Sequence, residues 1–107
     1  MRFRAVDKKN FDEVRHGLKI VETRAATPRY AAIEKGDVLV FVCGKERLEK
    51  KIKKVRQFGT ISMMLRSISP SKIMPSAPSL KEMEKIYWSY SGYKEKIKKF
   101  GLVAFYI

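Results

Sequence analysis

The sequence predicts one α+β domain, in which about five strands form a small curled sheet or β-barrel and three or four helices pack around it. The length supports a single domain, because 107 residues match the usual domain size. The composition supports an independent core, because 45% of the residues are hydrophobic. The pattern supports a mixed fold, because strand-like and helix-like segments follow one another in the order β-α-β-β-β-α-α-β.

The chain is expected to begin with a strand over residues 2–6 and a helix over residues 8–16. Asp7 is placed to cap the helix at its start, and Gly17 is placed to end it. Two apolar residues, Phe11 and Val14, share one face of the helix and predict its contact with the core.

Residues 18–25 alternate like a half-buried strand, whose core-facing members would be Leu18, Ile20, Glu22 and Arg24. Ionic side chains on an apolar face are costly unless they pair or serve a site. Glu22 and Arg24 can pair on this face. Lys19 can join them only if the strand twists or bulges near its start.

The middle of the chain predicts a loop over residues 26–35, a turn at 35–37 and a buried strand over 38–43. Gly44 suits a hairpin turn to the next segment. Residues 46–58 fit both a helical period and an exposed, partly bulged strand, and we favour the strand.

The C-terminal part predicts two main helices joined by a rigid loop over residues 69–79, which holds three of the four prolines. Thr60 caps the first helix, and Ser79 with Glu82 forms a capping box at the start of the second. A short basic helix over 93–99 and an apolar strand, FGLVAFYI, follow. That strand is expected to seal a sheet edge or to meet a second copy, so we expect a monomer or a weak homodimer.

Positive charge dominates the composition, with 24 lysines and arginines against 11 acidic residues and a net charge of +13. Such a field favours nucleic acid as a partner, although a solvated, lysine-rich surface would have the same composition. The chain has a single cysteine, so an internal disulfide is excluded. With only one histidine in addition, the sequence also argues against a structural zinc site. We expect no metal, no cofactor, no membrane span and a cytoplasmic location.

The pattern G-x-K-x-x-E-x-R at residues 17–24, placed after a short helix, resembles the signature of the ASCH domain family. Other features of the resemblance occur in the expected order: the helix FDEVRHG, the KGD turn into VLVFV, the proline-broken helical region and the closing strand. The resemblance covers nearly the whole chain. It implies that residues 1–107 form a single domain with a PUA-like β-barrel.

The same resemblance implies a cleft between barrel and helices that binds RNA or a nucleotide. Lys19, Glu22 and Arg24 would line that cleft, and the loop TPRY at residues 27–30 would border it. Arg29 is then a candidate phosphate contact and Tyr30 a candidate base contact.

Aromatic residues near the end of the later helix are further candidates for ligand binding. Tyr90 and Tyr93 are included among the expected RNA contacts, and either Trp88 or Tyr90 is expected to project toward the cleft as a stacking surface. The alternative interpretation is that these rings pack within the domain.

An enzyme is the alternative function, with Lys19 as base or nucleophile and Glu22 as proton shuttle. One branch of the family deacetylates N4-acetylcytidine with a Lys, a Thr and a later Glu. Lys19 matches, but Glu22 occupies the Thr position and Thr23 lies one residue away. The region expected to carry the later Glu reads MPSAPS and holds no acid until Glu82.

Another branch cleaves RNA with Lys, Tyr and Ser. Lys19 with Tyr30 or Tyr93, and with Ser89 or Ser91, could imitate that set. A second alternative is a protein-interaction module whose basic surface meets an acidic partner.

Overall fold

The computed structural model describes residues 2–5, 8–76 and 79–107, and it confirms the α+β class. Within these residues there are six strands and six helices, more than the sequence predicts. The strands are β1 (Arg2–Ala5), β2 (Val21–Ala25), β3 (Val38–Cys43), β4 (Glu46–Lys51), β5 (Lys54–Phe58) and β6 (Leu102–Tyr106). The helices are α1 (Lys8–Arg15), α2 (Pro28–Ala31), α3 (Ile61–Ser67), α4 (Pro70–Ile73), α5 (Leu80–Ser89) and α6 (Tyr93–Phe100).

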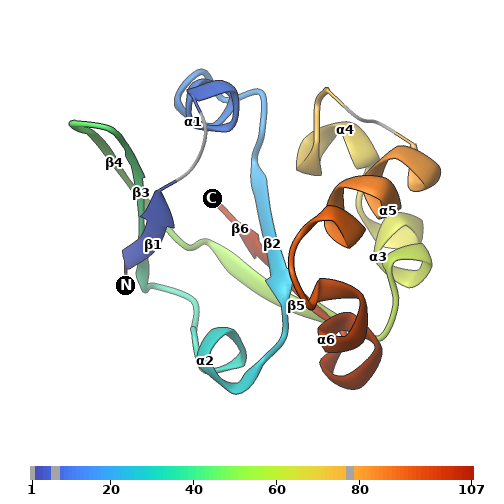
Figure 1. The fold of residues 1–107 in the computed structure, drawn as a ribbon. Helices are drawn as coiled ribbons and strands as arrows, with labels where there is room; N and C mark the ends of the chain where they lie inside the picture. Colours follow the sequence, from blue (N-terminus) through green and yellow to red (C-terminus); the bar gives the residue numbers. More distant parts are fainter. Residues whose placement is uncertain (1, 6–7, 77–78) are drawn as a thin grey trace.

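The strands form two three-stranded sheets, one in the order β1-β3-β4 and the other in the order β2-β6-β5 (Figure 1). The pairing of β1 with β3 is parallel, and the other pairings are antiparallel. In the part of the chain that the structure describes, the strand ladders do not join into a closed barrel. The predicted α+β class is therefore confirmed, whereas the described residues form two separate sheets in place of the predicted β-barrel.

The segment over residues 46–58 is extended, as predicted, but it is two strands in different sheets. The chain leaves the first sheet after β4 and enters the second at β5. At the crossing, the Ile52 side chain is buried and its amide donates to the Asp37 carbonyl, while the Lys53 amide donates to the Tyr106 carbonyl. These contacts are long-range, so the local pattern of residues 46–58 cannot reveal the break.

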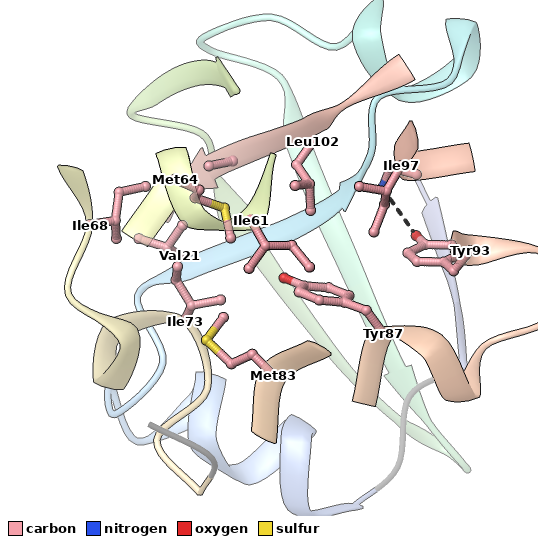
Figure 2. Close-up of a cluster of buried hydrophobic side chains, with 12 residues drawn as sticks. Val21, Ile61, Met64, Ile68, Ile73, Met83, Tyr87, Tyr93, Ile97 and Leu102 are labelled. Atoms are coloured by element: carbon pink, nitrogen blue, oxygen red, sulfur yellow. Dashed lines mark hydrogen bonds between the residues drawn. The ribbon is translucent and has the colours of Figure 1, made fainter. Parts of the chain in front are cut away.

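β6 lies at the centre of its sheet and separates two hydrophobic cores. Leu102 and Ala104 face a core built with residues of α3, α4, α5 and α6, part of which is drawn in Figure 2. Val103 and Phe105 face the other core, which includes residues of α1 and β3. The prediction that this strand seals a sheet edge is therefore wrong, because β6 has β2 on one side and β5 on the other.

β2 begins at Val21, three residues later than predicted, and the expected core positions of Leu18 and Ile20 are wrong. Leu18 is 62% exposed and Ile20 is 38% exposed. The residues after α1 instead complete a turn, in which the amides of Leu18 and Lys19 both donate to the Glu13 carbonyl. The predicted cap at Asp7 lies outside the described residues.

Both predicted loops contain a one-turn helix that starts at a proline, α2 at Pro28 and α4 at Pro70. Proline suits the first turn of a helix because its missing N–H has no intrahelical partner there. The two predicted caps are confirmed. The Thr60 side chain accepts a hydrogen bond from the Met63 amide, and Ser79 accepts one from the Glu82 amide.

Candidate functional site

Lys19, Glu22 and Arg24 converge on a single carboxylate oxygen. Glu22 Oε1 lies 3.4 Å from Lys19 Nζ and 2.6 Å from Arg24 Nη1. The side chains of Lys19 and Glu22 are 8% and 2% exposed, and that of Arg24 is 15% exposed. We call these three residues the ion cluster. Lys19 reaches it because it lies in the irregular segment between α1 and β2 and not on a regular strand.

The antiparallel register of β2 and β6 determines which way the cluster points. Glu22 is opposite Phe105 and Arg24 is opposite Val103, so both lie on the sheet face that carries the second core. Thr23 lies between them on the other face. Its hydroxyl forms a hydrogen bond with the Tyr87 hydroxyl, on the side covered by the helices.

The two oxygens of the Glu22 carboxylate have different surroundings. Oε1 also accepts a hydrogen bond from the Thr23 amide at 3.0 Å, whereas Oε2 is buried and has no partner among the described residues. Burial alone would raise the pKa of Glu22, but the charges of Arg24 and Lys19 and the Thr23 amide outweigh it and lower the pKa. Glu22 is therefore an anion at neutral pH.

α1 also contributes to the cluster, because Lys19 Nζ donates a hydrogen bond to Asn10 Oδ1 at 2.9 Å. Asn10 is not among the residues that the sequence points to. No short motif connects it to Lys19, and the contact follows from the way that α1 turns back onto the start of β2. The amide oxygen holds the ammonium group without adding charge.

Arg24 connects the ion cluster to a second group of side chains at the solvent boundary. Its guanidinium lies 5.9 Å from the centre of the Tyr30 ring, and the guanidinium of Arg29 lies 5.2 Å from the same ring. Arg29 and Tyr30 belong to α2, where Arg29 is exposed and Tyr30 is half-buried. Burial by itself would lower the pKa of Arg24, but Glu22 and nearby tyrosine hydroxyls raise it. The structure thus brings together five of the expected ligand residues.

Tyr93 and Tyr90 lie on the helical side of β2. Tyr93 is buried, its ring is stacked 6.3 Å from that of Tyr87, and its hydroxyl accepts a hydrogen bond from the Ala25 amide at 3.3 Å (Figure 2). Tyr90 is 43% exposed and meets Tyr93 edge to face at 5.3 Å. Packing is sufficient to explain the position of Tyr93.

A family model for the ASCH domain matches residues 5–107. The chain belongs to the ASCH domain family. The predicted family is thereby confirmed over nearly the whole chain. The ion cluster of this ASCH domain is formed by Lys19, Glu22 and Arg24.

Two solved structures have the same fold as this ASCH domain. The hypothetical protein PH0355 has a TM-score of 0.83 and 27% identity, with 99% of this chain and 96% of that chain covered. Protein PF0455 from Pyrococcus furiosus has a TM-score of 0.78 and 25% identity, with 99% and 94% covered. No curated protein matches the chain.

The described residues of this ASCH domain hold no group of three or more His, Cys, Asp or Glu side chains that could hold a metal ion. None of its helices, within the same residues, is long and apolar enough to cross a membrane. The site itself combines three cationic groups, Lys19, Arg24 and Arg29, with the carboxylate of Glu22 and the aromatic ring of Tyr30.

Proposed function

We propose that this ASCH domain binds RNA or a nucleotide at a site formed by the ion cluster and by Arg29 and Tyr30 of α2. The observation that carries the proposal is the position of Arg24. Its guanidinium is paired with a buried carboxylate on one side and lies near an aromatic ring and a second guanidinium on the other.

The ion cluster is a costly arrangement for a purely structural role. Charges taken out of water lose their hydration, and apolar residues of similar volume are often as stabilising as a buried ion pair. Strongly perturbed, buried ionisable groups gather at functional sites for this reason. Here, one anion holds two cations in place, so the cluster keeps a net positive charge that suits a phosphate.

The groups of α2 match the other parts of a nucleotide. Arg29 is exposed and offers a planar fork of donors to a phosphate. Tyr30 offers a ring on which an unpaired base can stack.

The catalytic alternatives have less support than binding. Thr23, the threonine nearest to the position used by the deacetylating branch, is bonded to Tyr87 on the opposite face of β2 from Glu22. Ser89, a candidate for the ribonuclease set, donates its hydroxyl to the Ile86 carbonyl within α5. The role of Lys19 and Glu22 in our proposal is therefore to hold Arg24 and the ligand.

The test is the salt dependence of binding to a short, labelled single-stranded RNA, followed by fluorescence anisotropy. Arg29→Ala is compared with Arg66→Ala, which removes the same charge from an exposed position on α3. A plot of log K against log salt has a negative slope for RNA binding. If Arg29 contacts a phosphate, Arg29→Ala makes this slope less steep by about 0.7, as expected for the loss of one contact with a single strand. Arg66→Ala leaves that slope unchanged.

Two results would overturn the proposal. One is an absence of RNA binding by the wild-type chain at low salt. The other is an equal effect of Arg29→Ala and Arg66→Ala, which would mean that RNA responds only to the total charge. Binding of an acidic peptide, with none of RNA, would favour the protein-interaction alternative.

A further inference from the structure

The outer face of α5 carries an unusual combination of exposed side chains. Lys81, Lys85 and Trp88 follow the spacing i, i+4, i+7 and therefore form one stripe along the helix. Together with Glu84 and Ser89, they line an open depression of about 540 Å³. We call these five residues the α5 surface.

Trp88 lies outside the buried face of α5. The inward face of α5 is formed by Met83 and Tyr87, which are fully buried in the first core. Trp88 is 37% exposed, although it is the largest apolar side chain of the helix. No ion pair within the described residues holds Lys81 or Lys85. The stripe thus presents an aromatic ring and two cations to solvent.

We propose that the α5 surface is a second contact for single-stranded RNA, in which a base stacks on Trp88 and the neighbouring phosphates meet Lys81 and Lys85. The inference rests on the proposed function and extends it to a longer ligand. Stacking on an exposed ring beside a basic track is how proteins bind single strands with little sequence preference. The two lysines are one helical turn apart, about 6 Å along the axis, so they can follow a backbone past the ring.

The α5 surface is distinct from the ion cluster. Tyr87, the residue before Trp88, binds Thr23 on the helical face of β2, whereas Glu22 and Arg24 lie on the other face. An RNA molecule that contacts both sites must therefore pass around β2, and it must be longer than one nucleotide. RNA that is too short to span the two sites should bind at only one of them, and it should lack the additional affinity that simultaneous contact with both sites provides.

The single tryptophan of the chain makes this surface directly observable. We would titrate the full chain with oligoadenylate and follow the intrinsic fluorescence of Trp88. Saturable quenching by oligoadenylate, and none by inorganic polyphosphate at equal charge, is the expected result, because quenching requires a base on the ring. Quenching by polyglutamate equal to that by RNA would overturn the inference and indicate an acidic protein partner.

Two sets of variants test the residues by anisotropy with the same RNA. Trp88→Leu should weaken binding about 5- to 150-fold, the range for loss of one stacked base, while Trp88→Phe should retain most of the affinity. The double variant Lys81→Ala with Lys85→Ala should weaken binding more than Lys94→Ala with Lys98→Ala, which removes two exposed lysines at the same spacing from α6.

The outcomes separate this inference from the proposed function. If RNA binds in an Arg29-dependent way and leaves the fluorescence of Trp88 unchanged, the α5 surface is not a contact and the proposed site stands. Equal losses in the two lysine double variants would also overturn the α5 surface. If RNA quenches Trp88 while Arg29→Ala and Arg66→Ala bind alike, the proposed site fails and the α5 surface remains. An absence of RNA binding overturns both.

Discussion

Glu22→Gln is the substitution that most directly tests the ion cluster. Glutamine has nearly the same volume, and its amide oxygen can still accept from the Thr23 amide, so the change removes little except the negative charge. Lys19 and Arg24 are then left as two cations with side chains only 8% and 15% exposed and with no anion between them. Breaking a buried ion pair by removing one partner typically costs about 3–5 kcal/mol. Tm should fall by at least about 12 °C, at about 4 °C for each kcal/mol in a domain of this size.

The assays are urea and thermal denaturation followed by circular dichroism, with Glu49→Gln as the matched control. Glu49 lies 3.8 Å from Arg47, and both side chains are more than 60% exposed, at 62% and 64%. An exposed pair of this kind contributes about 0–1 kcal/mol. If Glu22→Gln costs no more than Glu49→Gln, the substitution does not leave Lys19 and Arg24 buried without an anion, and the charges of the ion cluster are solvated in solution.

Three further predictions concern other parts of the structure. The pKa of Glu22 in the folded state lies below its usual 4.5. The free energy that ionised Glu22 contributes to folding is therefore present above pH 4.5 and is lost as pH falls through the folded-state pKa. Urea titrations in acid should accordingly show a smaller difference in the free energy of unfolding between wild type and Glu22→Gln. Thr23→Val should cost about 1–3 kcal/mol, because the buried Tyr87 hydroxyl loses its partner, without a change in RNA affinity. Gly101→Ala should lower Tm more than Gly44→Ala, since both have positive φ but only the first would place a Cβ 2.3 Å from a backbone carbonyl. The first argument is contradicted if the difference in free energy of unfolding between wild type and Glu22→Gln does not depend on pH. The second is contradicted if Thr23→Val is as stable as wild type, and the third if Gly101→Ala and Gly44→Ala have equal Tm values.

Features that depend on neighbours in the sequence were predictable. Thr60 and Ser79 cap helices because each hydroxyl reaches an amide three residues later, and that geometry needs nothing from the rest of the chain. The pairing of Glu22 with Arg24 follows in the same way from the alternation of a strand. These are contacts over two or three residues.

Features that depend on distant parts of the chain were not predictable. Leu18 and Ile20 have the pattern of core residues, yet the turn after α1 and the late start of β2 leave them exposed. Tyr93 carries a ring that suits a ligand site, and only the position of Ala25 and Tyr87 shows that it is held in the core. Asn10 acquires its role from the approach of α1 to Lys19, which the motif does not include.

The central position of β6 has a consequence for the order of events during synthesis. β2 and β5 have no hydrogen-bonded contact with each other in their sheet and are joined only through β6. β6 begins at Leu102, far downstream of the end of β5 at Phe58. A ribosome therefore delivers both outer strands long before their common partner exists, and the sheet that carries Glu22 and Arg24 can assemble only after residues 102–106 have left the exit tunnel.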